Sequence, residues 1–204
     1  MKELKIAVLL TITLLLTSCA SGYKMINPKN LNYNSNSTNK DVTLNYKYDL
    51  LDKKYAKKET KREVKVVAIK ITNHSENDLI FGKDIRLTYE NGKELYILEK
   101  EKTFNSVKQN TIPYLFYLLL TPMTLNKTTI NGNGIETSST PIGFAVGPGL
   151  AAGNMIAAGS ANKKLKNDLL NYDILGANIK KGETIYGLIG IKSDNYDSIK
   201  IKVE

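Results

Sequence analysis

The chain has 204 residues, enough for one ordinary domain with extra segments, and contains 29 Lys and Arg residues against 20 Asp and Glu residues. With 42% hydrophobic and 24% charged residues, the composition excludes a disordered chain and a protein with many membrane spans. A single Cys and a single His exclude an internal disulfide, a thiolate metal cluster and a His-pair metal motif. The net charge of +9 comes almost entirely from lysine, with Arg62 and Arg86 the only arginines, so we expect no nucleic-acid partner.

The first 19 residues have the pattern of a secretion signal. Lys2 and Lys5 precede the apolar run Ile6 to Leu16, which at about 11 residues is short for a membrane span and typical of a signal-peptide core. The run ends in Leu16-Thr17-Ser18-Cys19. This ending resembles the lipobox of bacterial lipoproteins, in which an apolar residue and two small residues precede the Cys that is acylated.

The resemblance implies removal of residues 1–18, a diacylglycerol thioether on the Cys19 sulfur and a further acyl chain, such as palmitate, on its new amino group. Several acyl chains hold a protein stably at a membrane. Ala20 stands where an Asp would favour retention at the inner membrane, so the family analogy implies the outer membrane, facing the periplasm. The alternative interpretation is an uncleaved N-terminal anchor in which Cys19 stands by chance.

Residues 19–41 predict a lipid anchor followed by a flexible tether, because the segment is rich in Asn, Ser and Lys and poor in apolar residues. Val42 to Leu50 alternates apolar and polar residues, which predicts a strand. We interpret the charged residues 52–63 as a solvated connection; the alternative is a surface attracted to an anionic membrane or polymer.

Further short strands follow over residues 42–204. The β-branched run 64–73 predicts a central strand or a bulge near Val66-Val67. Asn91-Gly92 predicts a hairpin turn that joins strands over 85–89 and 95–98. Two more strands are expected near the C-terminus, over 184–191 and 199–203. Six to eight short antiparallel strands predict a mainly β fold, and a β-sandwich is the best fit.

Three of these segments resemble the immunoglobulin-like accessory domains of bacterial envelope lipoproteins. They are Val64 to Ser75, the Asn91-Gly92 hairpin, and the approach from Gly182-Glu183 to Tyr186-Gly187. The resemblance implies an immunoglobulin-like antiparallel β-sandwich, and many such domains have no assigned activity.

A weakly charged insertion at about 110–171 interrupts the strands. An apolar run over 112–120, a polar loop over 126–140 and a Gly-rich uncharged stretch predict an apolar helical hairpin. Small residues on one helix face allow close helix packing or oligomerisation, and the stretch is similar to glycine-zipper segments of envelope lipoproteins; these residues are Gly143, Gly147, Gly149 and Gly153. We expect the hairpin to pack over the sandwich. The alternatives are a membrane-dipping or oligomerising hairpin and a transmembrane helix.

The sequence indicates no catalytic constellation, cofactor or metal site. His74 lies in a polar turn and lacks the Gly-x-Ser-x-Gly motif that would supply a nucleophile. Asp194, Asn195 and Asp197 carry calcium-type ligands without an EF-hand pattern, so we interpret them as a solvated turn. The sequence therefore predicts a non-enzymatic binding or structural module of the cell envelope. The alternative is a self-associating or membrane-interacting component, and the partners would be the membrane, an envelope protein or a second copy.

Overall fold

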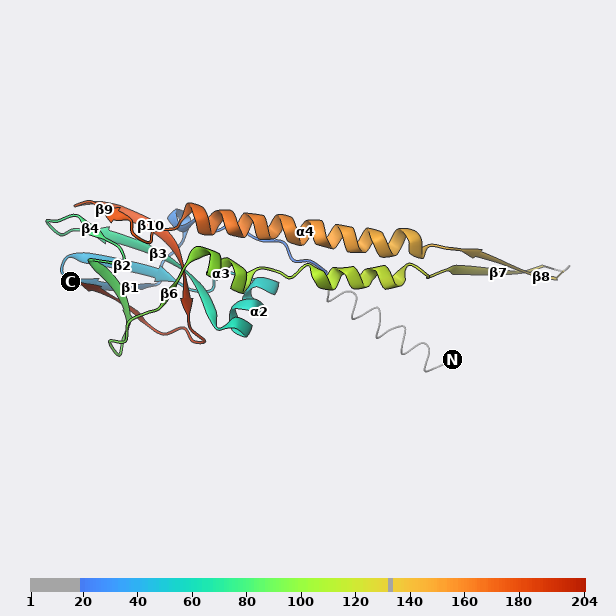
Figure 1. Ribbon diagram of the computed structural model, residues 1–204, viewed down its shortest axis with the longest axis horizontal. Coiled ribbons are helices and arrows are strands. Elements are labelled where there is room, and N and C mark those ends of the chain that lie inside the picture. Colours follow the sequence, from blue (N-terminus) through green and yellow to red (C-terminus); the bar gives the residue numbers. More distant parts are fainter. Residues whose placement is uncertain (1–18, 132–133) are drawn as a thin grey trace. The chain divides into compact units, whose positions relative to one another are not determined.

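The computed structural model describes residues 19–131 and 134–204. The chain forms two compact units. The core unit comprises Tyr23–Gln109 and Asn162–Glu204, and the described part of the insertion unit comprises residues 19–22 and Asn110–Ala161 (Figure 1). The division falls inside one long helix, which contributes residues to both units.

A five-stranded antiparallel sheet organises the core unit, with strand order β1-β2-β3-β10-β6. The strands are β1 (Ser35–Asn39), β2 (Val42–Lys47), β3 (Val64–Asn73), β10 (Thr184–Lys192) and β6 (Ile97–Leu98). β3 is the middle strand, and its first six residues are all buried because both faces of the sheet are covered there. Its pairing with β10 runs without interruption from Val64↔Lys192 to Thr72↔Thr184, so the expected central strand is confirmed and no bulge is present.

Two smaller strand pairs complete the core unit. They are β5 (Ile85–Tyr89) with β11 (Ile199–Val203), and β4 (Leu79–Ile80) with β9 (Asn178–Ile179). Side chains from both pairs join those of β2, β3 and β10 in one buried cluster, which includes Leu44, Ile69, Phe81, Leu87, Ile179, Ile191 and Ile199. The predicted mainly β, antiparallel architecture is confirmed.

The expectation of a flexible tether is wrong for much of residues 23–39. Pro28–Asn30 form the 3-10 helix η1, Ile26 is buried, and β1 pairs with β2 along its whole length. The polar residues that suggested a tether have a structural use. Ser37 Oγ accepts the backbone N–H of Ile201 at 3.2 Å, and Asn39 Oδ1 accepts that of Val203 at 3.3 Å. Short polar side chains here bond the backbone of β11.

The prediction of a solvated connection over 52–63 is also wrong, because this segment forms the helix α2 (Lys53–Arg62). Tyr55 and Glu59, four residues apart, are its buried face, and the lysines lie mainly on its exposed side. The helix ends where Glu63 takes a left-handed conformation, with φ of 51°.

The Asn91-Gly92 turn is confirmed, but the strand expected over 95–98 does not stay beside β5 (Ile85–Tyr89) along its whole length. Its first part contacts β5 and its second part pairs with β10. Gly92 has φ of +80°, the left-handed conformation that such a turn requires. The Leu95 N–H donates to the Leu87 carbonyl oxygen at 2.9 Å, which continues the hairpin. Ile97–Leu98 then leave β5 and pair with β10, and the helix α3 (Lys100–Val107) follows.

Residues 110–161 of the insertion unit form two helical segments separated by a β-hairpin. The first is the 3-10 helix η2 (Ile112–Leu120), and the second is the beginning of α4 (Gly143–Asn171). The polar loop expected over 126–140 is instead the hairpin β7 (Leu125–Asn131) and β8 (Gly134–Thr140). Thr-rich segments suit extended strands, and the Oγ1 atoms of Thr128 and Thr137 face each other at 3.2 Å. Among the helices of residues 19–131 and 134–204, none has the length and apolarity to cross a membrane.

Candidate functional site

Cys19 is exposed, and the residue after it is fixed to the insertion unit. The Ala20 backbone N–H donates to Asn154 Oδ1 of α4 at 2.6 Å. The Asn154 side-chain amide is oriented for this bond, because its Nδ2 donates to the Leu150 carbonyl oxygen at 2.8 Å. Ala20 also packs against a buried cluster made by η2 and α4, which consists of Tyr114, Tyr117, Ala151 and Ala158. The chain therefore follows the insertion unit from its first described residues. The signal peptide, including Leu16, Thr17 and Ser18, lies outside the described residues.

A second fixed point holds the chain to the core unit. Asp168 of α4 is 7% exposed and accepts hydrogen bonds from the Tyr23 hydroxyl and the Ile26 backbone N–H, both at 2.8 Å. Burial and the neighbouring carboxylate raise the pKa of Tyr23, so its phenol stays protonated and donates. The Tyr23 ring also meets the Tyr55 ring edge to face, with centroids 5.5 Å apart. In the sequence only residues 20–22 lie between Cys19 and Tyr23. The sequence analysis did not single out Asp168. The available hint was its position, because an acidic residue stands there between the apolar residues Leu165 and Leu169 of a predicted helix.

The two ends of the insertion are joined within the core unit. The Gln109 backbone N–H donates to Asn162 Oδ1, and Asn162 Nδ2 donates back to the Gln109 carbonyl oxygen, both at 2.9 Å. The Tyr55 hydroxyl donates to the same Asn162 Oδ1 at 3.1 Å. This pair fixes where the insertion leaves and re-enters the core unit.

The four glycines proposed for helix packing divide into two pairs. A Cβ on Gly143 would lie 2.3 Å from the carbonyl oxygens of Leu120 and Thr121, and one on Gly147 would lie 2.9 Å from that of Tyr117. These two glycines let α4 approach the η2 backbone closely. Around Gly149 and Gly153, by contrast, no described atom beyond the local helix lies within 4 Å of a Cβ. Within the described residues, both glycines face open space.

Large apolar side chains are exposed on η2, the hairpin and α4 alike. Phe116, Leu119 and Ile156 are 70%, 74% and 72% exposed. The others in this unit are Ile112, Leu115, Leu118, Met123, Leu125, Ile130, Ile135, Phe144, Val146 and Leu150. Lys127 and Glu136 are the only charged residues between Asn110 and Ala161. Within the described part of the insertion unit, η2, β7, β8 and α4 therefore leave these side chains uncovered.

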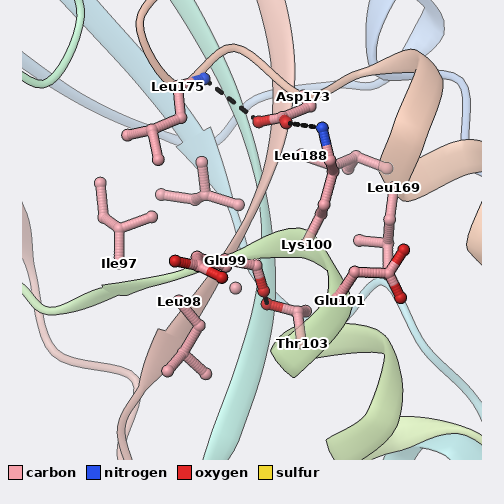
Figure 2. Close-up of a pocket in the computed structure, with 12 residues that line it drawn as sticks. Ile97, Leu98, Glu99, Lys100, Glu101, Thr103, Leu169, Asp173, Leu175 and Leu188 are labelled. Atoms are coloured by element: carbon pink, nitrogen blue, oxygen red, sulfur yellow. Dashed lines mark hydrogen bonds and ion pairs between the residues drawn. The ribbon is translucent and has the colours of Figure 1, made fainter.

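The core unit also contains a small pocket between α3, β10 and the end of α4 (Figure 2). Its volume is about 230 Å³, below the ~300–1,000 Å³ typical of small-molecule sites. Figure 2 shows Lys100 and Asp173 directed toward each other at the rim, where Lys100 Nζ lies 2.8 Å from Asp173 Oδ2. The hydrogen bond and charge of Asp173 raise the pKa of Lys100, which favours the charged form of its amine. Leu98, Leu169 and Leu188 line the apolar part. The pocket contains no nucleophile paired with a base.

The remaining sequence candidates lie apart from these features. His74 is exposed in the turn after β3, where its backbone N–H donates to the Asp41 carbonyl oxygen at 2.8 Å. Asp194, Asn195 and Asp197 are exposed between β10 and β11. Within residues 19–131 and 134–204, no group of three His, Cys, Asp or Glu side chains is arranged to hold a metal ion. Comparisons of the chain with protein-family models, curated proteins and solved structures found no match.

Proposed function

We propose that the chain is a bacterial envelope lipoprotein, held at the membrane by an acylated Cys19, and that it acts as a non-enzymatic binding or structural module. The observation that carries this proposal is the order of segments at the N-terminus. Two lysines, an apolar run of about 11 residues and Leu16-Thr17-Ser18-Cys19 follow one another as in a lipoprotein signal. Cys19 is exposed, which is compatible with a bulky lipid on its sulfur.

The core unit suits a module that presents a surface. We assign it to an immunoglobulin-like β-sandwich, supported by the single buried cluster that joins β2, β3 and β10 to β5 and β11. The passage of Ile97–Leu98 from the β5 hairpin to β10 links the two layers. The Lys100–Asp173 ion pair, which occupies the one lysine at the rim of the pocket beside α3, is the observation that favours a structural or binding role over catalysis there.

The outer membrane, facing the periplasm, is the proposed location, because Ala20 stands where Asp would favour the inner membrane. The contacts of Ala20 and of Tyr23 with α4 replace the long tether expected from composition. A lipid on Cys19 would therefore hold the protein close to the bilayer surface.

Incorporation of labelled palmitate tests this function. Cells that express the wild-type chain should label a membrane-bound protein, whereas Cys19→Ser should give an unlabelled precursor that keeps its signal peptide. As a matched control, Ser21→Ala changes a small residue beside the acylated position and should label like the wild type. Label that persists in Cys19→Ser would contradict the proposal.

A second candidate function is a self-associating or membrane-interacting component that uses the insertion. The observation that favours it is the set of exposed apolar side chains on η2, β7, β8 and α4, together with the open faces of Gly149 and Gly153. Self-association predicts that Gly153→Leu lowers the mass of the detergent-solubilised complex, and an unchanged mass would contradict it.

A further inference from the structure

We propose that the insertion unit enters the lipid bilayer that receives the acyl chains of Cys19, with its exposed apolar side chains in contact with lipid. This proposal rests on the proposed acylation of Cys19. It adds a second, protein-made contact with the membrane and names the residues that make it.

The first argument is the apolar surface of α4 within the insertion unit. Gly143, Gly147, Ala151 and Ala158 are buried on one side, while Phe144 and Ile156 are exposed at 70% and 72%. Between Gly143 and Ala161 only Asn154 and Ser160 have polar side chains, so the side of the helix that η2 does not cover is largely apolar and suits an apolar environment. η2 repeats the pattern, with Tyr114 and Tyr117 buried against α4 and Phe116 and Leu119 exposed.

The second argument is charge. The segment from Asn110 to Ala161 has two charged residues, whereas lysines stand at both of its ends in the sequence, as Lys108 before it and Lys163 and Lys164 after it. All three lysines are exposed. Lysines that flank an apolar segment place their ammonium groups at the headgroups, where anionic lipids attract them. This charge pattern fits a bilayer with anionic headgroups.

The third argument decides between lipid and another occupant. Ala20, the residue after the proposed lipid site, is bonded to Asn154 and packed against the η2–α4 cluster. Consecutive Cα atoms lie ~3.8 Å apart, so acyl chains on Cys19 begin within a few ångströms of the insertion unit. The lipid anchor and the exposed apolar side chains thus belong to one compact unit. Because the acyl chains of Cys19 insert in a bilayer, the apolar surroundings nearest to these side chains are lipid.

The test uses the full-length chain, expressed with its signal so that Cys19 is acylated and unavailable for labelling. Single cysteines are introduced by Leu119→Cys and Ile156→Cys in the insertion unit, and by Lys83→Cys at an exposed turn of the core unit as the control. Each is labelled with the environment-sensitive fluorophore NBD. The proteins are reconstituted in vesicles of phosphatidylethanolamine and phosphatidylglycerol, with and without nitroxide-labelled lipids.

We expect NBD at residues 119 and 156 to fluoresce several-fold more strongly than NBD at residue 83, and nitroxide lipids to quench only the first two. Weak, unquenched fluorescence at residues 119 and 156 would overturn the proposal. Strong fluorescence that nitroxide lipids do not quench would also overturn it, because a second copy or another protein would then cover the surface. The mass of the N-terminal peptide, measured on the same samples, reports acylation separately. An unmodified Cys19 therefore refutes the proposed function, whereas the quenching result alone decides whether the insertion meets lipid.

Discussion

Glu59 offers a quantitative test of how the core unit is assembled. Its side chain belongs to α2 and is buried, with the residue only 4% exposed, and one carboxylate oxygen accepts the Val66 backbone N–H at 2.7 Å. Burial raises its pKa from 4.5 to about 7, with a small contribution from Asp49, while the Val66 hydrogen bond and Lys65 act in the opposite direction. We expect Glu59→Gln to stabilise the protein at high pH, because glutamine keeps an acceptor for Val66 and has no charge to bury.

The sign and size follow from proton linkage. Between pH 4.5 and about 7 the folded state holds a proton that the unfolded chain has released, so the free energy of unfolding falls as the pH rises through this range. Each pKa unit corresponds to ~1.36 kcal/mol, so the wild type loses at most roughly 3 kcal/mol by about pH 8. Glu59→Gln should lack this loss and differ little from the wild type at about pH 4.

Urea unfolding followed by tyrosine fluorescence, at about pH 4 and about pH 8 in one detergent buffer, measures the difference. Glu136→Gln is the matched control, because Glu136 is exposed on β8 and should change the free energy of unfolding by less than ~0.5 kcal/mol. If Glu59→Gln gave no gain at about pH 8, or the same gain at both pH values, the assignment of a charge-burial penalty to Glu59 would be refuted.

Three further substitutions, with Gly153→Ala as a control for one of them, test contacts within the two units. Gly190→Ala should destabilise the core unit by ~2 kcal/mol or more in urea unfolding, because its Cβ would lie 2.0 Å from Thr103 Oγ1. Gly143→Ala should separate η2 from α4 and increase proteolysis of the insertion unit, whereas Gly153→Ala, in open space, should leave proteolysis unchanged or reduced. Asp168→Ala should lower the free energy of unfolding by ~1–3 kcal/mol and expose the Tyr23 segment to faster hydrogen exchange.

Each of these has an outcome that contradicts it. Wild-type stability of Gly190→Ala would mean that Thr103 of α3 does not lie against Gly190 of β10. Equal proteolysis of the two helix variants would remove the distinction between the covered and the open glycines. Unchanged exchange near Tyr23 in Asp168→Ala would mean that this carboxylate does not hold the N-terminal segment.

The parts of the fold that the sequence predicted are those with local signals. β3 was recognisable because most of its residues from Val64 to Ile71 are Val or Ile. The turn at Gly92 was recognisable because Asn-Gly favours the left-handed conformation. The errors arose where a residue's partner lies far along the chain. Ser37 looked like part of a tether, but it accepts a hydrogen bond from Ile201, 164 residues away.

The same distinction applies to the candidate site. Cys19 stood out because the signal pattern that precedes it is contiguous. Asp168 did not, because its partners Tyr23 and Ile26 lie 145 and 142 residues away. The four glycines look equivalent in the sequence, and only the position of the η2 backbone separates Gly143 and Gly147 from Gly149 and Gly153. The spacing of glycines along a helix could not reveal which face of that helix packs against another segment.

The mass of the N-terminal tryptic peptide from the membrane fraction tests the central claim most directly. Trypsin cuts after Lys24, so a processed chain yields the peptide Cys19 to Lys24. The proposed lipoprotein predicts that this peptide begins at Cys19 and carries a diacylglyceryl group on the sulfur and an acyl chain on the amino group. A peptide that begins before Cys19, or that contains an unmodified Cys19, would contradict the claim.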